Sequence, residues 1–342
     1  MAVVGVMYNL KGDPPEEGEP PDLGAELDSE STVLAVASAL KAYGHDVCLI
    51  EGNDTALMEL RARSLDIVFN MCEGIRGESR ESHIPAVLEM LGIPYTGSGV
   101  LSLSVTLDKP MTKKVLAYHG IPTAKFRVFT SESDIDLEDL EYPVFVKPSH
   151  EGSSIGVSPS SFCAKPLELH REARRLLKAY GQPVLVEEFL PGREFTVGII
   201  GNKNPHVFPI MEINFDLIPE SHGMLYSRQF KTDWSEEVYY SCPASMPLEL
   251  EEAVRDIALR TFRVLECRDL SRVDIRLDKN GVPNVMEVNP LPGLVPGFSD
   301  YPRIAEKDGW SYEELINGVL GCALGRHNLF HLLPARFCRQ IA

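Results

Sequence analysis

The sequence predicts a chain of mixed α/β and α+β class, in which a Rossmann-like parallel sheet comes first and two α+β units follow. Three observations support this prediction. The first third alternates apolar strands with amphipathic helices, which is typical of a parallel sheet covered by helices. After residue 118 the alternation gives way to strands interrupted by single helices. The 342 residues also exceed one ordinary core, since domains hold roughly 100–200 residues.

The first unit is predicted to span residues 1–108. Within it, apolar positions at helical spacing predict a helix that ends at Gly44, and a second helix is expected to end at Gly92. A loop rich in Pro, Gly and Glu covers residues 11–27. The expected strands are Val3–Tyr8, Val47–Ile50 and Asp66–Asn70, and the expected helices are Ser31–Tyr43 and Ile84–Leu91.

Residues 109–200 are predicted to form the second unit and residues 201–325 the third, with 326–342 as a tail. The stretch from 214 to 238 is irregular, which favours a functional lid or disorder. A helix at 248–265 and a hairpin at 272–289 close the third unit. The other expected elements are helices Lys109–Tyr118 and Leu167–Tyr180, and strands Phe126–Phe129, Val144–Lys147, Val184–Glu187, Phe195–Ile200 and Val207–Ile213.

Composition excludes several classes of protein. Hydrophobic residues make up 44% of the chain and charged residues 24%, so disorder cannot be its main state. The net charge of −17 repels phosphate backbones and anionic lipid, and we therefore expect neither nucleic acid nor membrane as a partner. The 7 cysteines are scattered singly and the N-terminus resembles a strand rather than a signal peptide, which together favour a cytoplasmic protein.

The strongest chemical signal is the late hairpin. Side chains alternate along a strand, so Arg272 and Asp274 share one face of its first strand. We expect Val285, Glu287 and Asn289 to share a face of its second strand. If these faces coincide, two carboxylates and an amide oxygen form a set that suits Mg²⁺. The alternative is an amphipathic hairpin with a solvated charged face.

Two other segments carry weaker signals. Lys147 ends an apolar strand and precedes a Gly/Ser loop whose backbone N–H groups could approach a phosphate. Glu187 and Glu194 flank a Pro-Gly bend, where carboxylates could accept hydrogen bonds from a nucleoside. A plain turn and two solvated hairpin ends are the alternatives. Neither a Walker loop nor a dinucleotide-binding glycine fingerprint is present, which disfavours an NAD-type oxidoreductase.

Taken together and in order, these segments resemble the ATP-grasp superfamily and, within it, the D-alanine–D-alanine ligases. The resemblance extends over most of the chain and implies ATP clamped between two α+β lobes. It further implies an ATP-dependent ligase that joins two amino acids, or small peptides, through an acyl phosphate, and a possible homodimer. A nucleotide-binding regulatory protein without turnover is the alternative.

The resemblance also assigns roles to individual residues. Arg272, Ser153 and the Gly293 backbone would stabilise the tetrahedral intermediate. Two Mg²⁺ ions, with Mn²⁺ as a possible substitute, would bind Asp274, Glu287 and Asn289. The residues implied to bind ATP are Lys109, Lys147, Ser154, Glu187, Glu188, Phe189, Leu190, Glu194 and Lys231.

The amino-acid pocket departs from the family pattern. Glu73 stands where the family usually has a histidine. An N-terminal acid that contacts the first substrate could be Glu26, Asp28 or Glu30, and we take Glu30 together with Glu73 as candidate substrate contacts. Ser299 is the candidate for the second substrate's carboxylate. We therefore expect an ATP-dependent ligase whose amino-acid substrates need not be D-alanine.

Overall fold

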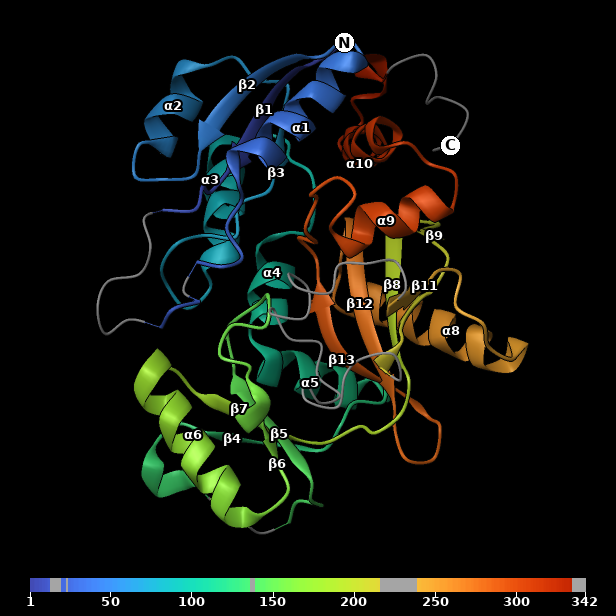
Figure 1. Ribbon diagram of the computed structural model, residues 1–342. Coiled ribbons are helices and arrows are strands. Elements are labelled where there is room, and N and C mark those ends of the chain that lie inside the picture. Colours follow the sequence, from blue (N-terminus) through green and yellow to red (C-terminus); the bar gives the residue numbers. More distant parts are fainter. Residues whose placement is uncertain (13–19, 23, 136–138, 216–238, 334–342) are drawn as a thin grey trace.

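The computed structural model describes residues 1–12, 20–22, 24–135, 139–215 and 239–333, whose strands form three sheets (Figure 1). The first sheet lies at the top of Figure 1, the second at the bottom beside α6, and the third on the right. This is the predicted combination of a parallel sheet with two α+β lobes. None of the helices in these ranges combines the length and the apolar character that a bilayer-spanning segment needs.

The first sheet is parallel, as expected, with the order β2–β1–β3. Helix α1 begins after Ser29, whose hydroxyl accepts the backbone N–H of Thr32 at 3.3 Å. Helix α3 ends at Gly92, whose φ of 68° lies in the left-handed region that favours glycine. The elements of this unit are β1 (Val3–Tyr8), α1 (Glu30–Ala42), β2 (Asp46–Glu51), α2 (Ala56–Ala62), β3 (Ile67–Asn70), α3 (His83–Leu91) and α4 (Val100–Leu107).

The second sheet is antiparallel with the order β4–β7–β5–β6, and α6 packs against one of its faces. Val144 and Val146 belong to the core under α6, whereas Phe145 and Lys147 point to the opposite face. Helix α5 (Lys109–Tyr118) precedes this lobe and packs Leu116 into the core of the third sheet. The elements of the lobe itself are β4 (Phe126–Phe129), β5 (Val144–Pro148), β6 (Phe162–Cys163), α6 (Pro166–Tyr180) and β7 (Val184–Glu188).

The third sheet is built around β8, which pairs with β9, β10 and β12. The predicted boundary at residue 200 would leave β8 in the second unit, but its hydrogen bonds place it here. The strand expected over 207–213 is divided in two, and Pro209, which has no N–H to donate, lies in the break. The strands are β8 (Glu194–Gly201), β9 (His206–Val207), β10 (Met211–Ile213), β11 (Tyr240–Ser241), β12 (Asp269–Leu277) and β13 (Pro283–Asn289).

In the described part of the chain after residue 239, the α-helices are α8 (Leu248–Val264), α9 (Asp300–Lys307) and α10 (Tyr312–Arg326). Helix α8 covers the apolar face of the third sheet. Helix α10 was not expected, and it packs against α1 of the first unit, next to the N-terminus in Figure 1. Asn317 of α10 donates to the carbonyl of Ala39 at 2.8 Å. The core of the first unit is therefore completed by residues close to the end of the described chain.

Candidate active site

A cavity of about 150 Å³ lies between the second and third sheets. Each sheet buries its other face under a helix, α6 or α8, so polar side chains on the remaining faces point into the space between the lobes. The lining includes most of the residues expected to bind ATP and metal: Lys109, Lys147, Ser153, Ser154, Glu187, Glu188, Phe189, Leu190, Glu194, Arg272, Asp274 and Glu287.

Glu187 is the best-paired carboxylate of this cavity. Its two oxygens lie 2.6 Å from Lys147 Nζ and 2.5 Å from Lys113 Nζ. Burial alone would raise the pKa of Glu187, but the two ammonium groups lower it to about 2. Glu187 is therefore a fixed negative charge, and Lys147 is held at the cavity wall by it.

The hairpin brings the expected metal-binding residues together, with one correction. Asp274 lies opposite Glu287 and Arg272 opposite Asn289, as the convergence required. Val285 does not share their face, because the register shifts by one residue between Asp274 and Ile275. This β-bulge leaves Val285 in the apolar core and turns Glu287 toward the cavity.

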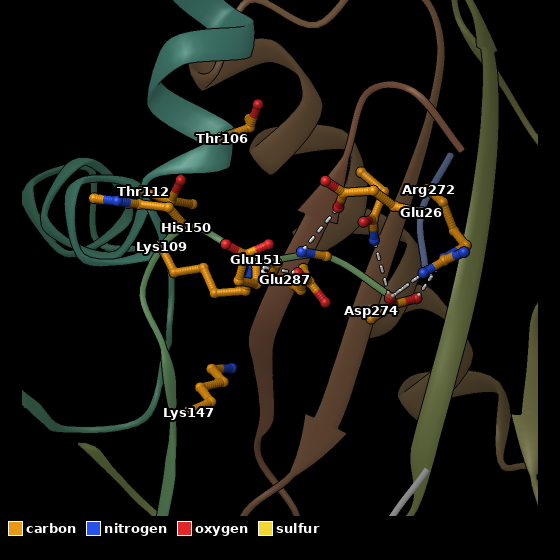
Figure 2. A network of polar contacts seen from close by, with 12 residues as sticks. Glu26, Thr106, Lys109, Thr112, Lys147, His150, Glu151, Arg272, Asp274 and Glu287 are labelled. Atoms are coloured by element: carbon orange, nitrogen blue, oxygen red, sulfur yellow. Dashed lines mark hydrogen bonds and ion pairs between the residues drawn. The ribbon is translucent and has the colours of Figure 1, made fainter. Parts of the chain in front are cut away.

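Figure 2 shows Asp274 at the centre of a hydrogen-bonded group. The Arg272 guanidinium donates to both of its oxygens, at 3.0 Å from Nε and 2.9 Å from Nη2. Asn289 Nδ2 donates to Asp274 Oδ2 at 3.1 Å, and the Thr196 hydroxyl to Oδ1 at 3.0 Å. Asp274 is thus held in place by Arg272, Asn289 and Thr196.

Lys109 bridges the hairpin and the Gly/Ser loop. Its ammonium lies 2.7 Å from Glu287 Oε1 and also donates to the carbonyl of Glu151. Burial would raise the pKa of Glu287, but Lys109 and Lys147 lower it. Glu287 is thus an ionised carboxylate surrounded by positive charge.

The chemistry of these side chains fits a hard divalent cation. Asp274, Glu287 and Asn289 supply two carboxylates and an amide oxygen, the ligand types that Mg²⁺ prefers. Among the described residues, no cluster of three or more His, Cys, Asp or Glu has a metal-binding arrangement. An ion here would therefore complete its shell with water or phosphate oxygens.

The far end of the cavity combines aromatic and charged groups. Glu194 Oε2 lies 3.2 Å from Arg276 Nη1, and the guanidinium of Arg276 stacks 4.8 Å from the centre of the Phe189 ring. Glu188 Oε1 accepts the backbone N–H of Glu141 at 2.9 Å. A flat aromatic ligand could pack here beside carboxylates that accept hydrogen bonds.

The Gly/Ser loop is held against the first unit. Ser153 and Ser154 have φ angles of 48° and 59°, in the left-handed region that few non-glycine residues adopt. Glu26 Oε2 accepts the backbone N–H of Gly152 at 3.2 Å. Arg80 donates to Glu26 Oε1 at 2.5 Å and to the carbonyl of His150 at 2.8 Å, which fixes the loop over the cavity.

A second cavity, of about 170 Å³, adjoins the first. Lys109, Ser153, Arg272 and Glu287 line both cavities. The second cavity also includes Gly293, where a Cβ atom would meet the Ser299 hydroxyl at 2.8 Å. Its remaining polar lining comprises Glu26, Glu73, Glu81, Tyr240, Asn289, Ser299, Asp300 and Arg303.

Carboxylates crowd the inner end of the second cavity, where a smaller cavity of about 40 Å³ adds Asp28. Burial and the neighbouring acids Glu81 and Glu26 raise the pKa of Glu73 well above its ordinary range. Burial and Glu26 raise the pKa of Glu81 to about 8. Of the three N-terminal candidates, Glu26 lines both of these cavities and Asp28 the smaller one, whereas Glu30 is exposed in the first turn of α1.

Sequence reasoning missed three charged residues. Lys113 resembles a surface lysine of a helix, yet it is 1% exposed and binds Glu187. Arg80 and Glu81 lie in a segment for which we expected no site. The charge density of residues 78–81 was the available signal. Lys231 lies outside the described residues.

Comparisons with known proteins agree with this architecture. The family model described as D-ala D-ala ligase C-terminus matches residues 115–321. A D-alanine–D-alanine ligase of Cupriavidus metallidurans is 35% identical, with 91% of this chain and 93% of the relative covered. An uncharacterised protein of Sinorhizobium fredii, y4sG, is 37% identical over 95% of each chain.

The solved structures include a crystal structure of D-alanine–D-alanine ligase from Bacillus anthracis complexed with ATP. It superposes with a TM-score of 0.74 at 25% identity and covers 96% of this chain and 99% of that one. Fold and site thus define an ATP-dependent ligase with the ATP-grasp architecture. The chain belongs to the D-alanine–D-alanine ligase family.

Proposed function

We propose that the protein joins the carboxylate of one amino acid to the amine of another, with ATP as the energy source. One observation carries this proposal: the two cavities meet at Lys109, Ser153, Arg272 and Glu287. A terminal phosphate in the first cavity and a carboxylate in the second would therefore face each other across this junction.

The first cavity would hold ATP. Lys147 and Lys109, with backbone N–H groups of the Ser153–Ser154 loop, would bind the phosphates as positive charges and donors. The adenine and ribose would lie among Glu187, Leu190 and Glu194, with the backbone of 188–190 at the ring edge. The apolar residues that line the cavity and the carboxylates beside them support this orientation of the nucleotide.

Asp274, Glu287 and Asn289 would hold Mg²⁺. When bound, the metal would neutralise the phosphate oxygens. Lys109 and Arg272 already supply positive charge beside these carboxylates, at 2.7 Å from Glu287 and 2.9 Å from Asp274. The chain's own contribution is therefore a junction at which negative charge on the transferring phosphoryl group is stabilised.

In the reaction, the substrate carboxylate attacks the γ-phosphorus of ATP, ADP leaves, and an acyl phosphate forms. The amine of the second substrate then attacks the acyl carbon and phosphate leaves. Arg272, the Gly293 N–H and the Ser153 hydroxyl would stabilise the oxygen that gains negative charge in the tetrahedral intermediate. Positioning and charge stabilisation supply most of the rate enhancement in such a site.

The second cavity would bind the amino acids. Glu26 and Glu73 would bind the ammonium group of the activated substrate, and Ser299 the carboxylate of the other. D-Alanine is the first substrate to test, because related proteins are named for it. The acidic inner end and Glu73 favour a relative whose amino acid or small peptide differs from D-alanine. A homodimer and a cytoplasmic location stay predictions from the sequence.

Phosphate release from ATP, screened across pairs of D- and L-amino acids with product masses determined, tests the proposal. We expect ADP, phosphate and a dipeptide for at least one pair. ATP binding without turnover for any pair would instead support the regulatory alternative.

A further inference from the structure

Lys113 is a buried cation that the proposed reaction leaves without a role. It lies on α5, is 1% exposed, and is not among the residues that line the nucleotide cavity. Its ammonium contacts Glu187 Oε1 at 2.5 Å and the Thr123 hydroxyl at 2.6 Å. Burying a lysine this completely is costly unless its charge is paired. The presence of this buried ion pair beside the nucleotide cavity therefore requires an explanation.

Two lysines share this one carboxylate. Lys147 binds Oε2 of Glu187 from the cavity side, and Lys113 binds Oε1 from behind. Glu187 is itself only 6% exposed, so it needs a cation whichever ligand is present. These three groups together carry one net positive charge, and Lys147 also feels the negative charges of Glu287 and Glu194.

We propose that Lys113 is a positioning residue for the nucleotide: it holds Glu187 and balances its charge, so that Lys147 can turn from Glu187 to the phosphates. The proposal rests on the proposed function in one respect, that Lys147 binds phosphate. If Lys113 were neutral, a departing Lys147 would leave a buried carboxylate unpaired, which is strongly unfavourable. Lys147 would then stay on Glu187 and bind the nucleotide less well.

The surroundings of Lys113 suit a fixed rather than a mobile cation. The Thr123 hydroxyl that accepts from Lys113 donates to the carbonyl of Val285 at 2.8 Å, which ties it to β13. The Phe126 ring lies 5.6 Å from the ammonium. Burial and the nearby Lys147 lower the pKa of Lys113, and Glu187 raises it. Movement of Lys147 toward the nucleotide would therefore raise the pKa of Lys113 and favour its charged form.

The experiment compares Lys113→Met with Lys114→Met, because Lys114 is the next residue of α5 and is exposed. We expect Lys113→Met to raise the KM for ATP roughly tenfold, the loss typical of one hydrogen bond to a charged group. The KM for the amino acids should change less than about twofold, and Lys114→Met should match the wild type. Lys113→Arg keeps the charge and should recover most of the ATP affinity.

The double variant Lys113→Met/Lys147→Ala separates positioning from structural damage. With Lys147 absent there is nothing to release, so the loss caused by Lys113→Met should largely disappear in that background. A tenfold loss in both backgrounds, or an unchanged KM for ATP in Lys113→Met, would overturn the proposal. Should Lys113→Met fail to fold, Thr123→Val decides, because it removes the hydroxyl that orients Lys113 and its link to the Val285 carbonyl but keeps both charges, and it should raise the KM for ATP about threefold.

Calorimetric binding of ADP and ATP distinguishes this inference from the proposed function. If Lys147→Ala leaves nucleotide affinity unchanged, the phosphate role of Lys147 fails and the inference fails with it. If Lys147→Ala weakens binding and Lys113→Met does not, the inference alone fails.

Discussion

The pKa values of the carboxylates Glu187 and Glu287, in the nucleotide cavity, are shifted in the opposite direction from those at the inner end of the second cavity. In the nucleotide cavity, lysines lower the pKa values of Glu187 and Glu287 despite burial. At the inner end of the second cavity, burial raises the pKa values of Asp28, Glu73 and Glu81, and neighbouring acids add to the rise at Glu73 and Glu81. The carboxylates at the centre of the first cavity are already paired with cations, whereas at the inner end of the second cavity the lowering of the pKa by Arg80 and Lys109 is outweighed by burial and like charge. This difference is what a site for an anion next to a site for an ammonium group should show.

The largest effect is expected where the cavities meet. Glu287→Gln keeps the size of the side chain but removes its charge, so it should weaken metal binding and lower kcat by about 1,000-fold. Thermal unfolding should shift little, since Glu287 lies at a cavity wall. Near-normal turnover in this variant would contradict the metal assignment. It would also contradict the inference that the first cavity is an anion site next to an ammonium site.

Asp28→Asn tests the acidic end through stability. Burial raises the pKa of Asp28 from 3.8 to about 7, so the folded state binds this proton more tightly than the unfolded chain. The stability that this carboxyl contributes is complete below about pH 4 and is lost as the pH rises to about 7. The variant cannot ionise, and urea unfolding should show it gaining roughly 4 kcal/mol over the wild type between pH 4 and pH 8. A difference that stays constant with pH would contradict the raised pKa.

Lys147→Ala addresses the nucleotide cavity. Removing a charged donor to phosphate should raise the KM for ATP about 10- to 100-fold, while the KM for the amino acids changes less. Initial rates at varied ATP measure this, with Lys114→Met as the control. An unchanged KM for ATP together with near-normal kcat would count against the phosphate role.

Glu73→Gln should give the smallest change. In contrast to Lys147→Ala, it should affect the KM for an amino acid rather than the KM for ATP. We expect the KM for one amino acid to rise about three- to tenfold as the ammonium loses a charged partner, with the KM for ATP within twofold. Glu252→Gln, an exposed change on α8, is the matched control. If the variant binds ATP rather than the amino acid less tightly, the assignment of ATP to the first cavity and of the amino acids to the second is wrong.

Much of the fold could be predicted because its elements are locally encoded. The strands of the first unit and the α6 helix follow from apolar periodicity, and Gly92 ends α3 as expected. Helix α10 was missed, since it is apolar almost all round and shows no amphipathic pattern. Part of its burial comes from α1, more than 250 residues away, and part from β8 and β12, and no local window contains these partners.

The site was predictable in composition but not in detail. Strict alternation placed Val285 beside Glu287, and a bulge, which depends on the pairing of two strands, separates them. The sequence does not distinguish Lys113 from a surface lysine of a helix, because its partner Glu187 is distant along the chain. The choice among Glu26, Asp28 and Glu30 likewise depends on where the chain turns, and Glu26 is the one that Arg80 holds at the cavity.

The packing of α10 on α1 has a consequence for synthesis of the chain. The amino-terminal sheet leaves the ribosome long before the helix that shields its hydrophobic side, because residues 312–326 are made after both ligand-binding lobes. The nascent chain therefore carries an uncovered apolar surface until α10 has been made. A chain truncated before Tyr312 should expose that surface permanently and aggregate.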